Sequence, residues 1–367
     1  MNSKFKRTVC LTTALLTATV ATGAVAKAWA DQSNSISSKP LVETSTKTTN
    51  GSGIKDTCYS EEDCISMYKD LPGVSDEIKY IIERNGRESK KSINTINCFT
   101  DQAMMDCISK YKNNPNIAGD IIKELIDNYK FFYGCSMGRG PWMDYEQTRK
   151  HMVGAANILS NEIVVKCILG FEATPDIRKQ LTRIAFNTVD MEIVTTIANC
   201  LLKYEKLPEA AVTIVNPLAY KTVCAWWYYF GRGYEKGLID AGFKKGLIDI
   251  PKAFSDESVV NLILKYDNDP NTTGKIVEGI MYITFDVAYD SEYIWEAPHI
   301  KSEKKVMDAA LCISKYPEVA GEITDAFRDI ASNTRSEKAV SDAAQKISEA
   351  KTPEEAVEIA KRLQRNK

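Results

Sequence analysis

The sequence predicts an all-α protein built from helix–turn–helix repeats, on three observations. A five-residue motif recurs six times, a proline follows each copy within a few residues, and an amphipathic stretch follows each proline. The six copies begin at Cys64, Cys107, Cys167, Cys200, Leu262 and Cys312, and their prolines are Pro72, Pro115, Pro175, Pro208, Pro270 and Pro317. No long alternation of apolar and polar residues with a period of two is present in the sequence, so we expect almost no sheet.

The second copy shows why each unit is predicted to be two helices. Apolar residues step by three and four over 103–111 and again over 117–129, on the two sides of Pro115, which is the period of a helix with one buried face. Proline ends the first helix and is favourable at the first position of the second. Residues that predict helix N-termini, because each is a capping type followed by an acid, are Ser60, Thr100, Ser255 and Ser302.

The spacing of the copies predicts how the hairpins are arranged. Successive copies lie 43, 60, 33, 62 and 50 residues apart. The shortest spacing fits two helices of about 13 residues with short turns, so the longer spacings contain inserts. A hairpin with two apolar faces cannot bury both alone, whereas hairpins stacked side by side can. The sequence therefore predicts an α-solenoid of about six or more helix-turn-helix repeats with aromatic-rich inserts.

The last part of the chain predicts the end of this stack. Thr352, Pro353 and Glu355 fit a capping box with proline at the first helical position. The helices expected at 336–350 and 356–363 contain no aromatic residue and many Lys, Glu and Ala, as the final unit of a solenoid requires. Over residues 58–365 the pattern resembles the HEAT-like and armadillo-like class of helical repeats in architecture. It lacks the signatures of tetratricopeptide and ankyrin repeats.

The chain divides into three predicted parts. Residues 1–30 predict a secretory signal peptide, because a basic start and an apolar run precede the cleavage pattern that ends at Ala30. Cleavage after Ala26 and an uncleaved membrane anchor are the alternatives. Residues 31–56 are rich in Ser and Thr and predict a flexible linker, and 57–367 form the repeat domain. We expect a secreted or extracytoplasmic protein, at the cell surface or in a periplasm, with no membrane span in the mature chain.

Composition and charge exclude several classes of protein. The chain is 44% hydrophobic and 26% charged, which is typical of a soluble globular protein. Loss of residues 1–30 removes four basic residues and no acidic one, so the net charge changes from −2 to −6. A mildly acidic chain is not expected to bind nucleic acid, which needs a basic face to neutralise phosphates.

Cysteine usage indicates packing rather than a metal site. Five of the nine cysteines that follow residue 30 begin copies of the motif, and Leu262 takes that position in the fifth copy. A position that accepts Cys or Leu is predicted to be buried and apolar. The remaining cysteines are the pool from which disulfides could form, and their pairing stays open: Cys58, Cys98, Cys135 and Cys224. Because no Cys-x-x-Cys pair occurs, neither a metal nor another cofactor is expected.

Signals for catalysis or calcium binding are weak. His151 and His299 are the only histidines, and they are too far apart in the sequence to form a pair of metal ligands on one helix. We expect both at the surface or in helix packing. No nucleophile elbow, phosphate loop or dinucleotide fingerprint occurs. Residues 267–278 have the acid spacing of an EF-hand loop, but Thr272 stands where that loop needs glycine. We therefore expect this segment to turn the chain rather than to bind calcium.

Three aromatic segments are the best candidates for a functional surface. Residues 131–145, 220–234 and 282–299 contain 17 of the 33 aromatic residues, and two of these segments carry Gly-Arg-Gly. Inserts at equivalent places in a solenoid emerge along one edge, and aromatic residues next to arginine are typical of binding surfaces. The predicted binding residues are Arg139, Trp142, Tyr145, Arg232, Tyr234 and Trp295. The alternative, favoured for residues 224–230, is that the aromatic residues bury extra helices or fill gaps between repeats.

These observations favour a non-enzymatic secreted scaffold that binds a protein or a cell-surface polymer, such as a surface glycan, through the insert-bearing face. The alternative is an extracellular polysaccharide hydrolase or lyase on a closed all-α toroid, with an acid and a base drawn from Asp144, Glu146, Glu235 and Glu296. A purely structural envelope protein is a third hypothesis. The identity of the partner, the oligomeric state and the source organism do not follow from the sequence.

Overall fold

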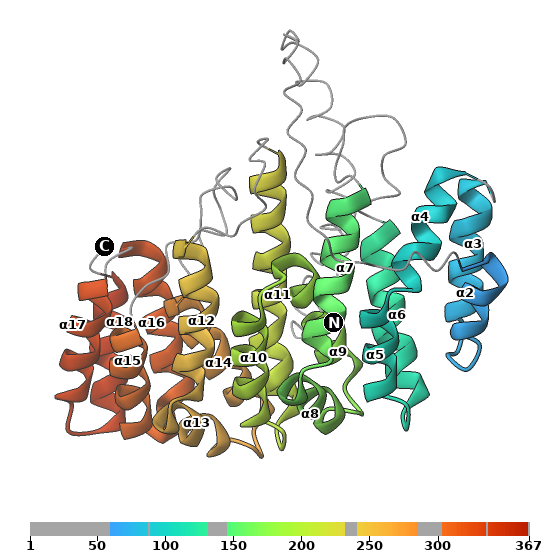
Figure 1. Ribbon diagram of the computed structural model, residues 1–367. Coiled ribbons are helices and arrows are strands. Elements are labelled where there is room, and N and C mark those ends of the chain that lie inside the picture. The colour runs from blue at the N-terminus through green and yellow to red at the C-terminus, as the bar shows by residue number, and fades with distance from the viewer. Residues whose placement is uncertain are drawn as a thin grey trace, which may run out of the picture. The chain divides into compact units, whose positions relative to one another are not determined.

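The computed structural model describes residues 59–86, 89–130, 145–231, 241–284, 303–334 and 337–365. Within these ranges the chain forms seventeen α-helices and one 3-10 turn, and no strand (Figure 1). The prediction of an all-α protein is confirmed for this part of the chain. The predicted signal peptide and linker lie outside the described residues.

The helices alternate along the chain between two sets. The motif helices are α2 (Glu61–Met67), α5 (Gln102–Lys110), α8 (Glu162–Gly170), α10 (Met191–Leu202), α13 (Glu257–Leu264) and α15 (Glu303–Lys315). In the C-terminal hairpin α17 (Glu337–Ser348) takes the corresponding place without a copy of the motif. The helices after the proline turns are α3 (Val74–Asn85), α6 (Pro115–Tyr129), α9 (Pro175–Thr188), α11 (Pro208–Gly231), α14 (Pro270–Thr284), α16 (Ala320–Thr334) and α18 (Pro353–Arg365). The six predicted hairpins and the C-terminal hairpin are thus all present.

Three further helices stand directly before a motif helix. They are α4 (Lys90–Phe99) before α5, α7 (Tyr145–Leu159) before α8, and α12 (Ala241–Ser255) before α13. The axes of α7 and α8 meet at 73°. At each of these breaks an apolar residue is followed by Ser or Thr and then by Asp or Asn, as in Phe99-Thr100-Asp101. Three of the four longer spacings between motif copies, those of 43, 60 and 62 residues, therefore contain a further helix as well as a connection.

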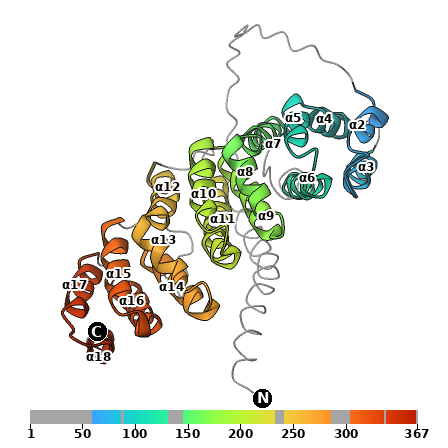
Figure 2. The same ribbon diagram turned by 90° about the horizontal axis from the view of Figure 1, so that it is seen from below.

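Helices pack mainly on helices that are near them in the chain (Figure 2). In the set that follows the prolines, α3 packs on α6, α6 on α9, α9 on α11, α11 on α14, α14 on α16, and α16 on α18. The motif helices, the three further helices and α17 form the other row, in which α2 packs on α4, α5 on α7, α8 on α10, α10 on α12, α13 on α15, and α15 on α17. The buried apolar side chains form one continuous cluster from Cys64 to Ala360. Each hairpin is therefore covered by the hairpin that follows it.

The helix N-caps differ from the prediction by one residue. Ser60 caps α2 in a capping box with Asp63, as expected. At α5 and α13 the cap is the acid itself, because Asp101 and Asp256 accept from the main chain two residues on, and Thr100 and Ser255 are not the caps. Ser302 lies outside the described residues. At α18, Thr352 accepts from the Glu355 amide at 3.3 Å, and Glu355 accepts from the amide of Lys351 instead of closing the box on Thr352.

Tyrosine at the end of the motif satisfies the carbonyl groups that the helix breaks leave free. A helix end exposes main-chain oxygens that have no partner within the helix. The hydroxyls of Tyr68, Tyr111 and Tyr204 donate to the main-chain oxygens of Phe99, Leu159 and Phe254 at 2.5, 2.8 and 2.5 Å. These oxygens end α4, α7 and α12, so each tyrosine joins one hairpin to the break that precedes the next motif helix.

Cysteine at the start of the motif is a core residue, as predicted. The five motif cysteines are free and buried, and so is Cys98. Burial raises the pKa of the thiol to about 12 in Cys64, Cys107, Cys167 and Cys200, and to about 11 in Cys312. Cys98 packs inside the core, so its assignment to the pool of disulfide partners is not supported. The side chains of Cys58, Cys135 and Cys224 lie outside the described residues.

Candidate functional site

The turns that contain the prolines lie next to one another at one edge of the helices, which we call the proline-turn edge (Figure 1, lower side). Tyr266, after α13, donates to the Pro317 oxygen at 2.5 Å, and Tyr316, after α15, donates to the Ala350 oxygen at 2.7 Å. A Cβ added to Gly119, in the second turn of α6, would lie 3.6 Å from the Pro72 ring. Side chains at this edge therefore join one hairpin to the next.

Ion pairs show that the helices after the prolines run in the same direction. Arg178, near the start of α9, pairs with Asp120 near the start of α6 at 2.6 Å. One to two turns further on, Arg183 pairs with Glu124, also at 2.6 Å. Because both pairs keep the same order along α6 and α9, these helices are parallel, and their C-terminal ends lie together at the edge opposite the proline turns.

We call this opposite edge the insert edge, because α6, α11 and α14, which precede the longest connections, end there. The connections after α3, α9 and α16 hold only a few residues. Those after α6, α11 and α14 span 131–144, 232–240 and 285–302. The proline turns, by contrast, are all short. Variation in connection length is therefore confined to one edge within the part of the chain that the structure describes.

The structure describes one of the six predicted binding residues. Tyr145 is the first residue of α7, at the insert edge, and its half-buried ring packs against the core. Tyr145 thus packs against the core and also lies at the insert edge. The predicted residues that lie outside the described ranges are Arg139, Trp142, Arg232, Tyr234 and Trp295.

The second aromatic segment is helical over most of its length. Residues 220–231 belong to α11, so the prediction that an insert begins at Tyr220 is wrong up to Gly231. The side chains of 224–231 lie outside the described residues, so the alternative that they bury extra helices or fill gaps between repeats stays a prediction. Tyr220 itself is 53% exposed, on the helix face that also exposes Asn216. The spacing of four residues between these two positions is the sequence signal for this exposed face.

The described residues contain neither a histidine placed for catalysis nor a pair of carboxylates placed for glycoside hydrolysis. His151 is half-buried in α7, with Nδ1 2.7 Å from the Phe186 oxygen, and desolvation lowers the pKa of its imidazole. His151 thus packs between helices, one of the two settings expected for it. Of the four carboxylates considered for glycoside hydrolysis, Glu146 is exposed in the first turn of α7. The other three, Asp144, Glu235 and Glu296, lie outside the described residues, as does His299.

The segment with EF-hand spacing does not form an EF-hand loop. The Asp269 carboxylate accepts from the Thr272 amide at 3.2 Å and from the Thr272 hydroxyl at 2.6 Å. Residues from Pro270 onward are already helix α14, so the later positions of the twelve-residue pattern lie on a helix. Among the described residues no group of three or more potential ligands could hold a metal ion.

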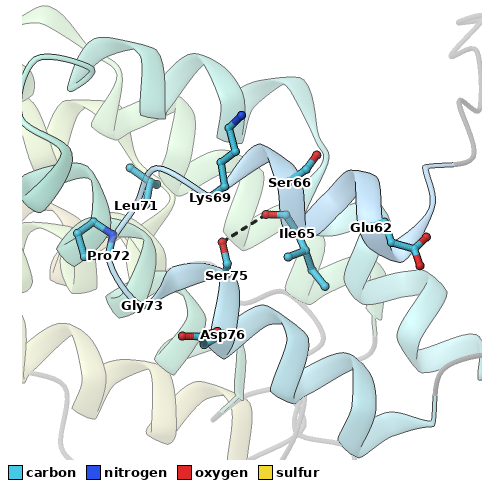
Figure 3. A pocket seen from close by; sticks show the side chains of 9 residues that line it. All are labelled: Glu62, Ile65, Ser66, Lys69, Leu71, Pro72, Gly73, Ser75 and Asp76. Carbon is cyan, nitrogen blue, oxygen red and sulfur yellow. Dashed lines mark hydrogen bonds between the residues drawn. The ribbon is translucent and has the colours of Figure 1, made fainter.

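A groove lies on the first hairpin, between α2 and α3 (Figure 3). Its volume is about 490 Å³, and Glu62, Lys69 and Asp76 lie at its rim. The Ser75 hydroxyl donates to the Ile65 oxygen at 3.3 Å across the hairpin. The groove is open, and its charged groups do not converge on one point (Figure 3). Its geometry therefore supports a contact surface better than an enclosed catalytic site.

Comparison with models of protein families, with curated proteins and with solved structures finds no match to this chain. Within the described residues no single helix is both long and apolar enough to cross a membrane, and only the bent pair of α7 and α8 passes that test together. The function is therefore inferred from the chain's own residues.

Proposed function

We propose that this protein is an exported α-solenoid scaffold without enzymatic activity, which binds a protein or a cell-surface polymer through its insert edge. The arrangement of the connections supports this proposal most strongly. Long connections follow α6, α11 and α14 at one edge, whereas the proline turns at the other edge are short. Function in repeat proteins is concentrated in loops that a rigid scaffold holds in place.

The aromatic and arginine content of the inserts indicates how binding would occur. Aromatic rings supply large rigid contact areas, and arginine supplies a planar cation, so both are enriched among residues that dominate binding energy. Trp142 and Arg139 lie in the first insert, Arg232 and Tyr234 in the second, and Trp295 in the third. Tyr145 adds a half-buried ring where the first insert joins α7.

The test uses the mature protein on a glycan array and, in parallel, on an array of extracellular proteins. We expect binding to one class of probe. The double variant Trp142→Ala/Arg232→Ala should lower that signal about tenfold or more, the effect of losing one binding residue worth at least 1.4 kcal/mol. The control is Leu311→Ala, which removes an exposed apolar side chain from α15. Equal binding by the double variant and the wild type would contradict the proposal.

A second measurement tests the exported location that the proposal includes. Residues 1–30 are expected to be removed during export, so N-terminal sequencing of the extracellular protein should begin at Asp31 or, with the alternative cleavage, at Lys27. An extracellular protein that retains Met1 would contradict cleavage. Retention of the protein in the cytoplasm would contradict export.

A further inference from the structure

The third copy of the motif lacks both side chains that link hairpins elsewhere. Its last two residues are Gly170 and Phe171, where four of the other copies have Lys-Tyr. In two of those copies the lysine reaches the next hairpin: Lys203 donates to the Ser255 oxygen at 2.5 Å, and Lys315 donates to the Ser348 oxygen. Phe171 is buried but has no hydroxyl to donate. The space that a lysine would cross is therefore left open at α8.

A groove of about 520 Å³ occupies this position. Val165 and Leu169 on α8 give it an apolar wall, and Gly170 forms part of its lining beside Glu205, from the turn after α10. A Cβ added to Gly170 would lie 3.0 Å from the Glu205 carboxylate. Glycine thus lets the end of α8 approach Glu205 closely, and a lysine at this position would lie in the groove.

Four charged side chains line the groove without partners. Lys110 and Lys166 are cations, Glu162 and Glu205 are anions, and all four are exposed. None of them forms an ion pair or a hydrogen bond in the described part of the chain, in contrast with the paired charges between α6 and α9. Each could gain a partner if a ligand with charges of both signs were bound.

We propose that this groove is a second binding surface, which takes a polypeptide segment of a partner protein with an apolar residue between a basic and an acidic one. The apolar residue packs on Val165 and Leu169. The acidic residue pairs with Lys110 and Lys166, and the basic residue pairs with Glu162 or Glu205. The groove lies at the proline-turn edge, so this inference goes beyond binding at the insert edge.

The lining favours a polypeptide over a polysaccharide or a nucleic acid. None of the described residues that line the groove is aromatic, whereas stacking on aromatic rings is a common way to hold single-stranded bases. Two carboxylates would repel the phosphates of a nucleic acid or the anionic groups of an acidic polymer. A segment with both charges and an aliphatic side chain complements the apolar wall and all four charged groups.

The test measures binding of the mature protein to short synthetic peptides by fluorescence anisotropy. One series has a central leucine flanked by lysine and glutamate in both orders, and the reference series replaces the charged residues with serine. We expect the mixed-charge peptides to bind about tenfold more tightly than the serine peptides. Gly170→Lys should abolish this difference, because lysine would fill the groove and pair with Glu205.

Gly170→Lys is expected to fold, because the end of a flexible carboxylate is the only group close to the new Cβ. Its melting temperature should equal or exceed that of the wild type, since glycine is unfavourable in a helix. Asn261→Lys is the matched control, which adds the same charge on the exposed face of α13 and should leave peptide binding unchanged. Glu205→Gln provides a second variant that leaves the backbone unchanged and should weaken binding.

Equal binding of mixed-charge and serine peptides would overturn the proposal, and so would unchanged binding by Gly170→Lys. Preference for purely acidic peptides would overturn the mixed-charge assignment. The Trp142→Ala/Arg232→Ala variant should keep its affinity for the peptides. Failure of this inference is thus distinguishable from failure of the proposed function, which the insert variants test.

Discussion

The two edges of the helical domain differ in how regular their connections are. At the proline-turn edge, the same tyrosine position makes an inter-hairpin hydrogen bond in five of the six motif copies. At the insert edge, connections range from a few residues after α9 to the segment 285–302 after α14. A repeated contact fixes the stacking of hairpins, so it tolerates little change, whereas connections outside the core can lengthen without disturbing it.

Stability and binding should therefore depend on different residues of the domain. Substitutions of the motif tyrosines at the proline-turn edge should lower stability because they leave buried main-chain oxygens unpaired. Substitutions in the long inserts should lower binding and leave stability nearly unchanged.

Tyr204→Ala should cause the largest loss, about 3–5 kcal/mol of unfolding free energy, because it opens a cavity in the core and removes the bond to the Phe254 oxygen. Tyr204→Phe keeps the ring and should cost about 1–3 kcal/mol, the price of an unsatisfied buried carbonyl. Urea unfolding followed by circular dichroism measures both. An unchanged stability of Tyr204→Phe would show that the hydroxyl bond does not hold the hairpins together.

Phe171→Tyr provides the reciprocal measurement at the same motif position. The phenylalanine ring is buried, so a hydroxyl added there without an acceptor should destabilise the protein by about 1–3 kcal/mol. A gain in stability would mean that the third copy has an acceptor like the others, and the distinction between Phe171 and the tyrosines would be lost.

Gly154→Ala tests the short connection between α9 and α10, at the insert edge. A Cβ at Gly154 would lie 2.2 Å from Cγ1 of Val189, which itself has a left-handed backbone with φ of 48°. The clash should cost about 1–3 kcal/mol. Val189→Gly removes the clashing side chain and suits the positive φ, so the double variant should recover most of this loss. Independent, additive effects in a double-mutant cycle would contradict close packing at this connection.

The sequence reveals the hairpins but not the hydrogen bonds that join one hairpin to the next. The 3.6-residue period and the prolines are local features, so the pairs α5–α6 and α8–α9 could be predicted. The triplet of apolar residue, Ser or Thr, and Asp or Asn also recurs before α5, α8 and α13 and could have revealed the helix breaks. The acceptor of Tyr111 could not be predicted, because a main-chain oxygen 48 residues away carries no sequence signal. The left-handed backbone of Val189 could not be predicted either, because β-branched residues disfavour a positive φ.

The candidate site could be predicted only as a set of residue types. Aromatic and arginine residues cluster visibly in the sequence, but tertiary packing decides which of them are accessible. Tyr145 shows this, because its ring lies at the insert edge and packs in part against the core. The groove beside Gly170 was missed, although the replacement of Lys-Tyr by Gly-Phe in one copy was the available signal.

Asn187→Leu should have a smaller effect and the opposite sign. Both polar atoms of the Asn187 amide are buried without a hydrogen-bond partner within the described residues. Leucine has a similar size and needs no partner, so the substitution should be neutral or should stabilise the protein by about 1 kcal/mol. Thermal unfolding measures this shift. A clear loss of stability would show that the amide has a partner that the helices alone do not supply.

His151→Gln should produce the smallest effect, a change in the pH dependence of stability. Burial lowers the pKa of the folded-state imidazole below that of the unfolded chain. The unfolded chain therefore binds more protons as pH falls through about 6.5, and stability decreases on acidification. Glutamine does not titrate, so urea unfolding of the variant between pH 7.5 and 5.5 should show a shallower decrease. An identical decrease in both proteins would show that other titratable groups cause the loss of stability on acidification.

The most direct test of the division between the edges measures stability and binding on the same two variants. Trp142→Ala should keep its unfolding free energy within about 0.5 kcal/mol of the wild type and lose binding on the array that the wild type recognises. Tyr204→Phe should lose stability and, at a temperature where it is folded, bind like the wild type. An unfolding loss in Trp142→Ala as large as that in Tyr204→Phe, or wild-type binding by Trp142→Ala, would contradict the account.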